Sequence, residues 1–208
     1  MASDLLFVNG TLMRGLADGK PARAVVPTGE EAATYRSFNL LTAKPVLYVC
    51  NVNEDDAANG NELSAAVFAK AKAEGANAVV VSAAIEADLV TMDMDERLVF
   101  LEEMGLHETG LARVIRAGYD LLHLITFFTV GPKEARAWTV EVGSKAPQAA
   151  GAIHSDFERG FIRAETIAYP DYVALGGESK ARDAGKLRQE GKEYVVADGD
   201  VLHFKFNV

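Results

Sequence analysis

Two continuous apolar segments with a helix between them constrain the fold of this chain more than any other feature. Pro45–Val52 is apolar on both faces and is bounded by proline and acidic residues, a pattern typical of a strand buried inside a parallel sheet. Residues 61–74 are predicted to form a helix, and Asn77–Ala83 is a second apolar strand. This order predicts a right-handed βαβ unit. Two strands are too few for a stable sheet of this kind, so the module looks incomplete.

The segments on either side of this unit are predicted to be mainly helical. A helix within residues 1–24 ends at Gly19, because glycine with a proline just beyond it is a stop signal, and another helix begins near Thr28. Helices are also predicted over 93–104 and 110–124. The last of them carries apolar residues at helical spacing that predict a buried stripe, namely Leu111, Val114, Ile115, Leu121, Leu122 and Ile125.

From residue 125 onward the pattern changes to that of a β-rich domain. Ile125–Val130 and Ala135–Val142 alternate around a Gly-Pro pair, which predicts a hairpin. The elements predicted after it are a helix over 147–160, a strand over 162–168, a short segment at 171–175, a charged helix near 178–190, and strands over 193–197 and 201–206. This order resembles a β-grasp domain. The fold class is therefore predicted to be α/β in the first part and α+β overall.

Composition excludes several classes of protein. Of 208 residues, 49% are hydrophobic and 25% are charged, which is ordinary for a globular protein that buries a core. A single cysteine excludes a disulfide framework, and the four histidines are too scattered to predict a structural zinc site. No apolar run approaches the roughly 20 residues that span a bilayer. Asp4 and Asn9 interrupt a short apolar start without a basic leader, so we expect no signal peptide and a cytoplasmic location.

The net charge of −9 is unevenly distributed. Residues 1–124 carry 10 basic and 18 acidic side chains, whereas residues 125–208 carry 11 and 12. The acidic first part is not expected to bind nucleic acid through its phosphates, but the second part can do so if its basic residues gather on one face. The change near residue 124 also favours a domain boundary there.

Polar residues follow both apolar strands. Asn51-Val52-Asn53-Glu54 ends the first, and Ser82-Ala83-Ala84 ends the second. Open α/β sheets bind ligands at the carboxyl ends of their strands, and GTPase folds carry Asn-Lys-x-Asp and Ser-Ala-x at these two places. Here valine and glutamate replace the lysine and aspartate of the first motif, which argues against selection of guanine. The alternative is a polar strand end with no ligand.

The chain shows no assembled catalytic centre, and we predict neither catalytic residues nor metal ligands. It contains no G-x-x-x-x-G-K-[ST] loop to hold phosphates, no H-E-x-x-H motif and no nucleophile elbow. The four histidines are isolated, and Cys50, which lies in the middle of a strand, is expected to be a small buried hydrophobic residue.

Basic residues cluster in the second part of the chain. Residues 180–192 carry a net charge of +3, and further basic residues flank the hairpin and a helix end. Contact with RNA phosphates is one interpretation, and a solvated charged surface is the alternative. The candidates for RNA or ribosome contact are Lys133, Arg136, Arg159, Arg163, Lys180, Arg182, Lys186 and Arg188.

Seven short stretches resemble the YchF/Obg-like ATPase family in order and spacing, from about residue 19 to the end. They are Gly19–Arg23, Asn51–Asp55, Arg113–Tyr119, Ala146–Gly151, Ile153–Phe157, Gly160–Ala164 and Phe206–Val208. The resemblance implies four regions: the end of a helical coiled-coil insert (1–24), the C-terminal part of an OBG-type nucleotide-binding domain (25–101), linking helices (102–122), and a TGS domain (123–206). The P-loop, the Mg²⁺ ligand and both switch regions would precede Met1.

The resemblance implies that the full-length protein is a ribosome-associated ATPase that uses ATP or GTP with Mg²⁺. Asn51 to Glu54 would frame the adenine and Ser82 to Ala84 would close the base pocket, while this chain alone would bind nucleotide weakly and hydrolyse none. The implied partner is the ribosome, its large subunit or its RNA, with no contact to DNA or membrane. A second hypothesis is a non-enzymatic module that binds RNA, the ribosome or a protein. A third is that the chain is not stable alone, because its two strands expose their edges.

Overall fold

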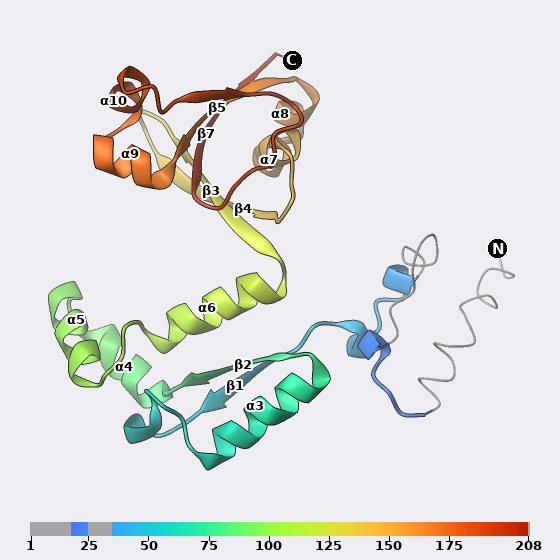
Figure 1. The fold of residues 1–208 in the computed structure, drawn as a ribbon, viewed down its shortest axis with the longest axis vertical. Coiled ribbons are helices and arrows are strands. Elements are labelled where there is room, and N and C mark those ends of the chain that lie inside the picture. The colour runs from blue at the N-terminus through green and yellow to red at the C-terminus, as the bar shows by residue number, and fades with distance from the viewer. Residues whose placement is uncertain (1–17, 25–34, 208) are drawn as a thin grey trace, which may run out of the picture. The chain divides into compact units, whose positions relative to one another are not determined.

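The computed structural model describes residues 18–24 and 35–207, which belong to two compact units, Met1–Leu121 (unit 1) and Leu122–Val208 (unit 2) (Figure 1). The chain combines helices and sheets, which confirms the predicted α+β class. The helix predicted near Thr28, and most of the one predicted within 1–24, lie outside the described residues. No helix in the described part of the chain is long and apolar enough to cross a membrane.

Unit 1 contains the predicted βαβ arrangement. Strand β1 (Leu47–Asn51) and strand β2 (Asn77–Val81) are parallel, and helix α3 (Glu62–Glu74) connects them. The side chain of Asn61 caps the first turn of α3 by accepting a hydrogen bond from the backbone N–H of Ser64. The prediction of a strand buried on both faces is wrong for β1, because Val49 is 50% exposed.

Three further helices follow β2, and the first was not predicted. They are α4 (Ala83–Thr91), α5 (Met94–Glu103) and α6 (Gly110–Leu121). The second predicted strand is therefore too long, since β2 ends at Val81 and Ala83 already begins α4. Ile85 and Leu89 of α4 are buried against Leu101 and Leu106, and this i, i+4 pair is the sequence signal for α4.

The apolar stripe predicted along α6 is only partly buried. Leu111, Ile115 and Leu122 are 60%, 52% and 53% exposed. The apolar stripe of α6 is wider than the sheet surface that could bury it, because the sheet formed by the described residues of unit 1 has only two strands. Short 3-10 turns complete this unit at Ala22–Ala24, Leu41–Ala43 and Glu54–Asp56.

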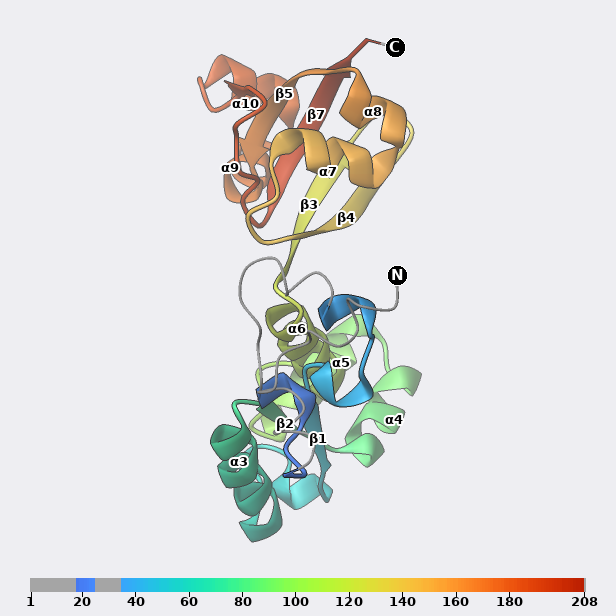
Figure 2. The same cartoon turned by 90° about the vertical axis from the view of Figure 1, so that its right-hand side faces the viewer.

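Unit 2 is a five-stranded sheet in the order β4-β3-β7-β5-β6, with helices on it (Figure 2). Its strands are β3 (Leu124–Val130), β4 (Ala135–Glu141), β5 (Phe161–Ala168), β6 (Arg188–Glu190) and β7 (Asp200–Phe206). The predicted hairpin is present as β3 and β4, which pair antiparallel. The last strand β7 lies parallel to β3 and antiparallel to β5, so the end of the chain occupies the centre of the sheet.

The helices of unit 2 correct several sequence predictions. They are α7 (Ala146–Ile153), α8 (Ser155–Arg159), α9 (Tyr169–Leu175) and α10 (Glu178–Asp183). The helix predicted over 147–160 is two helices, because His154 has an extended backbone. The charged helix predicted near 178–190 ends at Asp183. Residues 193–197 form no strand, only an isolated bridge between Val195 and Lys145.

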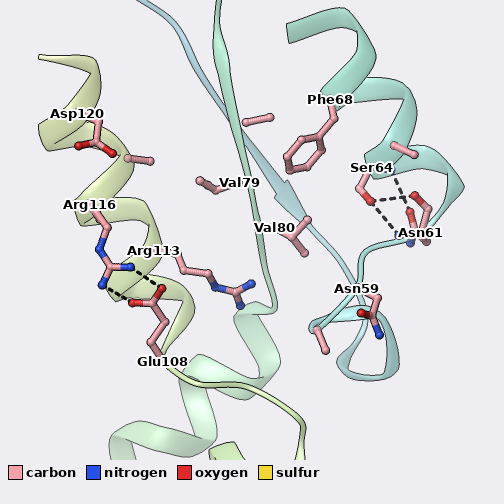
Figure 3. Close-up of a pocket in the computed structure, with 14 residues that line it drawn as sticks. Asn59, Asn61, Ser64, Phe68, Val79, Val80, Glu108, Arg113, Arg116 and Asp120 are labelled. Carbon is pink, nitrogen blue, oxygen red and sulfur yellow. Dashed lines mark hydrogen bonds and ion pairs between the residues drawn. The ribbon is translucent and has the colours of Figure 1, made fainter. Parts of the chain in front are cut away.

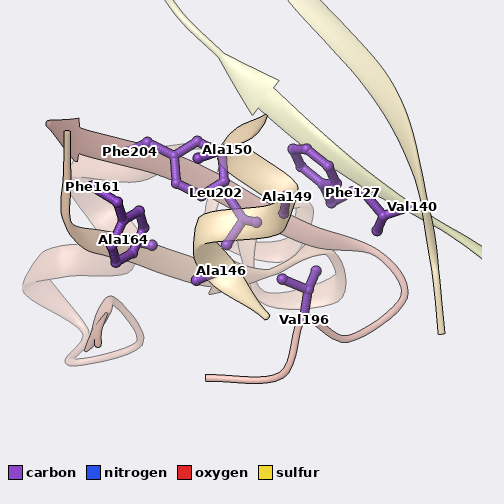
Figure 4. Packing of buried hydrophobic residues seen from close by; sticks show 10 residues of the cluster. All are labelled: Phe127, Val140, Ala146, Ala149, Ala150, Phe161, Ala164, Val196, Leu202 and Phe204. Atoms are coloured by element: carbon purple, nitrogen blue, oxygen red, sulfur yellow. The ribbon is translucent and has the colours of Figure 1, made fainter. Parts of the chain in front are cut away.

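The core of unit 2 lies between α7 and the sheet (Figure 4). Ala146, Ala149 and Ala150 are fully buried on one face of α7, and their small side chains let the helix approach the strands closely. Phe127 of β3 and Phe204 of β7 meet edge to face beneath it, with ring centroids 6.0 Å apart. This packing holds the hairpin and the last strand in one rigid sheet.

Candidate functional site

The polar segments that follow β1 and β2 lie side by side. The carboxamide oxygen Oδ1 of Asn51 accepts a hydrogen bond from the backbone N–H of Ala83, with 2.9 Å between the two atoms. Parallel pairing of the two strands brings these residues together across 32 positions of sequence. This bond fixes the orientation of the carboxamide. The Nδ2 amide of the exposed Asn51 then remains available to donate to a ligand.

The other residues of the first segment lie around Asn51. The backbone N–H of Val52 donates to the carbonyl of Val81 at 2.9 Å, so only the carbonyl of Val52 is left for a ligand. Asn53 precedes the short turn that begins at Glu54, and both side chains are exposed. The segment therefore presents an amide, a carbonyl and a carboxylate at one strand end, and these groups can pair with the edge of a heterocyclic base.

Ser82 to Ala84 form the start of α4. Ser82 is 2% exposed and precedes the helix, and its Oγ has no hydrogen-bond partner among the described residues. Ala83 and Ala84 are exposed and lie in the first helical turn, where the backbone N–H of Ala83 already donates to Asn51. The geometry thus joins the two predicted segments into one polar surface at the carboxyl ends of the strands.

Glu86 is a residue of this region that sequence reasoning missed. Its carboxylate lies in the first turn of α4 and accepts hydrogen bonds from the backbone N–H groups of Gly110 and Leu111, at 2.5 and 3.3 Å. It thereby caps the start of α6, and a Cβ at Gly110 would lie 3.0 Å from Glu86 Oε1. No local pattern gives this contact, because the partner lies 24 residues away.

Half of the predicted RNA-contact residues are engaged in ion pairs within unit 2. Arg159 pairs with Asp156, and its hydrogen bond lowers the pKa of that carboxyl. The other pairs join Arg182 to Glu178 at 2.7 Å, Lys186 to Asp171 at 3.3 Å, and Arg188 to Asp200 at 3.7 Å. These four cations are partly neutralised and are weaker candidates for phosphate contact.

Arg188 belongs to a small hydrogen-bonded network around the buried Asp200. Asp200 is 2% exposed, and its Oδ2 accepts hydrogen bonds from the Tyr194 hydroxyl at 2.7 Å and from the backbone N–H of Ala197 at 3.0 Å. Arg188 donates to the Tyr194 oxygen at 3.0 Å. Burial, followed by the hydrogen bond to Asp200, raises the pKa of Tyr194 to about 12. The network is a structural feature of unit 2.

The other four predicted residues form no ion pair with any carboxylate that the structure describes. They are Lys133 at the hairpin turn, Arg136 of β4, Arg163 of β5 and Lys180 of α10. Arg136 lies over the ring of Trp138, with 4.2 Å between its guanidinium carbon and the ring centroid. Of the eight predicted contact residues, these four are therefore the ones whose charge is free to contact phosphates.

Three residues of metal-ligating types lie together among the described residues of unit 2. Glu165, Glu178 and His203 bring their ligand atoms within 4.8 Å of one another. Glu165 already pairs with Lys205 at 3.5 Å and with Arg182 at 3.8 Å, so cationic side chains supply the charge that a metal would. We assign no metal to this cluster.

Comparison with known proteins decides the family. Residues 124–207 match the family model YchF-GTPase_C, described as "Protein of unknown function (DUF933)". The "Ribosome-binding ATPase YchF" of Bacillus subtilis is 54% identical over 191 residues, which cover 91% of this chain and 52% of the relative. The chain belongs to the YchF family. The resemblance expected from the seven stretches is thereby confirmed.

A further relative and a solved structure indicate the same family. The "Ribosome-binding ATPase YchF" of Escherichia coli O157:H7 is 54% identical over 186 residues, which cover 89% of this chain and 51% of the relative. The solved structure of the Schizosaccharomyces pombe YchF GTPase superposes with a TM-score of 0.80 at 34% identity, covering 94% of this chain and 52% of that one. This YchF-family chain thus spans about half the length of the relatives it matches.

Proposed function

We propose that unit 1 carries the purine-binding part of an OBG-type nucleotide-binding domain and that unit 2 is a TGS domain that contacts the ribosome. The observation that carries the first half is the 2.9 Å hydrogen bond from Ala83 to Asn51, which joins the two strand-end segments. The names of the relatives support both halves. Within this proposal residues 1–24 end a helical insert, 25–101 belong to the nucleotide domain, 102–122 link the two, and 123–206 form the TGS domain.

The nucleotide proposed for the full-length protein is ATP, with GTP as an alternative, together with Mg²⁺. The residues of this chain fit a base but not phosphates or the metal, because the sequence contains no phosphate-binding loop. Hydrolysis is therefore proposed for the full-length protein and not for this chain alone. The proposed base contacts are Asn51, Val52, Asn53, Glu54, Ser82, Ala83 and Ala84.

Replacing Asn51 by alanine is expected to weaken ATP binding to this chain about fivefold or more. The variant loses the free Nδ2 donor and also the acceptor that orients Ala83, and a net hydrogen bond is worth ~1 kcal/mol. The measurement is a titration of the ¹⁵N-labelled chain with ATP, followed through the backbone amides of Ser82 to Ala84.

Asn77→Ala is the matched control for this titration, since Asn77 is an exposed asparagine at the opposite end of β2. It is expected to bind ATP like the unchanged chain. Equal affinities of the Asn51 and Asn77 variants would show that the strand ends do not hold the base.

The proposed partner of unit 2 is the ribosome, through its large subunit or its RNA, which places the protein in the cytoplasm. The unpaired cations Lys133, Arg136, Arg163 and Lys180 support an interaction with phosphates. The second candidate is a module without enzymatic activity that binds RNA, ribosomes or a protein partner by itself. It is favoured if binding is independent of nucleotide.

Co-sedimentation of this chain with ribosomes, with and without ATP, at about 50 and 200 mM salt distinguishes these functions. Lys133→Gln combined with Lys180→Gln is expected to reduce pelleting at the lower salt and to flatten the salt dependence, because each phosphate contact releases counterions. Lys70→Gln with Lys72→Gln is the control, since both exposed lysines lie on α3 of unit 1. Equal effects of the two double variants would contradict a contact through unit 2.

A further inference from the structure

The outer edge of β2 is open. Among the described residues β2 pairs with β1 alone, and a cavity of about 650 Å³ adjoins it. The cavity is lined by three consecutive residues of β2, Ala78, Val79 and Val80. Because successive side chains of a strand point to opposite faces, a cavity that reaches all three runs along the strand's edge. The backbone groups on that edge are therefore accessible from the cavity.

Helices flank this edge on both sides. In Figure 3, Val79 points toward α6 and Val80 toward α3, whose Phe68 faces the strand and is 42% exposed. An added strand would place alternate side chains toward Phe68 of α3 and toward the largely charged side of α6, while its backbone continued the hydrogen-bond ladder. The cavity thus has the features of a site for an extended chain.

The guanidinium of Arg113 on α6 favours a ligand that carries a negative charge. Its guanidinium extends into the cavity (Figure 3), and the single hydrogen bond described for it joins Nη1 to the carbonyl of Ala57 at 3.4 Å. Its Nε is shielded from solvent and has no partner among the described residues. A guanidinium carries five N–H donors in a fork that matches a carboxylate, so most of the capacity of Arg113 is unused.

Arg116 shows the contrast one turn later on the same helix. Its two terminal nitrogens bind Glu108 in a bidentate pair at 2.8 and 2.7 Å. Arg116 therefore has its carboxylate, whereas Arg113 lines the same cavity and pairs with no carboxylate in the part of the chain that the structure describes. The neighbouring Asp120 and Glu108 and the acidic composition of unit 1 disfavour a polyanion such as RNA there, while a single carboxylate directed at Arg113 is compatible.

We propose that the open edge of β2 binds an extended segment of a partner protein as an added strand, with an Asp or Glu side chain of that segment paired to Arg113. This site is separate from the strand ends proposed to hold the base. It also differs in chemistry, because its ligand is a peptide backbone with one carboxylate.

The test uses the full ¹⁵N-labelled chain and a defined probe, the acetylated and amidated heptapeptide Val-Thr-Val-Asp-Val-Thr-Val. The expected result is a saturable shift of the Arg113 Nε–H signal and of the backbone amides of Ala78, Val79 and Val80. The same peptide with asparagine in place of aspartate is expected to bind about tenfold more weakly, because it cannot form a charge-assisted pair. A peptide with proline next to the aspartate is expected not to bind, because it lacks a ladder donor.

Arg113→Gln is expected to reduce affinity for the aspartate peptide to that of the asparagine peptide, and to leave the latter unchanged. Arg97→Gln removes the same charge from α5, outside the residues that line the cavity, and is expected to leave both affinities unchanged. Equal binding of the aspartate and asparagine peptides, or undiminished binding of the proline peptide, would overturn the proposal. So would an equal shift with sodium acetate alone, which would indicate a small-anion site. None of these outcomes depends on ATP binding at Asn51.

Discussion

Phe127→Ala is expected to lower the free energy of unfolding of unit 2 by about 3–5 kcal/mol. The ring of Phe127 is fully buried between Phe204 and the alanine face of α7. Neighbours as small as Ala146 and Ala149 cannot move in to fill the space, so a cavity remains where the ring was. Urea unfolding followed by tryptophan fluorescence measures the loss, because the chain has a single tryptophan, Trp138, and it lies in unit 2.

Val142→Ala is the control for this experiment. Val142 is 62% exposed, and its truncation is expected to change stability by less than about 0.5 kcal/mol. A loss below about 1 kcal/mol for Phe127→Ala would contradict the close packing of α7 on the sheet.

Asp200→Ala is expected to cost about 3 kcal/mol, because it leaves several groups without their acceptor. The carboxylate of Asp200 is almost fully buried and accepts hydrogen bonds from the Tyr194 hydroxyl and the Ala197 N–H, with Arg188 nearby. Thermal unfolding measures the cost. Asp198→Ala is the comparison, since Asp198 is exposed and accepts one hydrogen bond, from the backbone N–H of Thr126.

The pH dependence of stability gives a second readout for this network. The pKa of Tyr194 is raised from 10.0 to about 12, so the unfolded chain loses its proton first and stability falls as pH rises from 10 to 12. In Asp200→Ala the hydrogen bond and the negative charge that raise the pKa of Tyr194 are gone, so this pKa is expected to fall below 12. Tyrosinate absorbance measures this change, and Tyr194→Phe identifies the residue. An unchanged tyrosinate titration would contradict the role of Asp200.

Local patterns predict the fold well where the elements are regular. The apolar runs at β1 and β2, the helix α3 between them, and the hairpin of β3 and β4 are all visible in the sequence. Local patterns fail where a tertiary contact decides the backbone. Residues 193–197 are predicted to form a strand, yet they stay outside the five-stranded sheet and form only an isolated bridge, between Val195 and Lys145 at the start of α7.

Some features of the candidate sites can likewise be predicted from the sequence, and others cannot. The meeting of Asn51 with Ala83 follows from sequence, because the carboxyl ends of two parallel strands in one βαβ unit share an edge. The pairs of Arg159 with Asp156 and of Arg182 with Glu178 have i, i+3 and i, i+4 spacing, which a helix brings together. Whether Lys186 and Arg188 keep a free charge does not follow from sequence. That outcome depends on carboxylates such as Asp171 and Asp200, which the sheet and α9 bring to Lys186 and Arg188 from elsewhere in the chain.

The sequence alone therefore determined the family, the fold class and the position of the strand-end residues, because these depend on short motifs and on apolar periodicity. Only the tertiary structure decided that Glu86 caps α6, that Lys186 and Arg188 are paired, and that Arg113, beside an open strand edge, has no carboxylate partner among the described residues. The physical reason is distance along the chain. In these cases the contacts of the side chain are set by how separate elements pack, and local spacing carries no information about them.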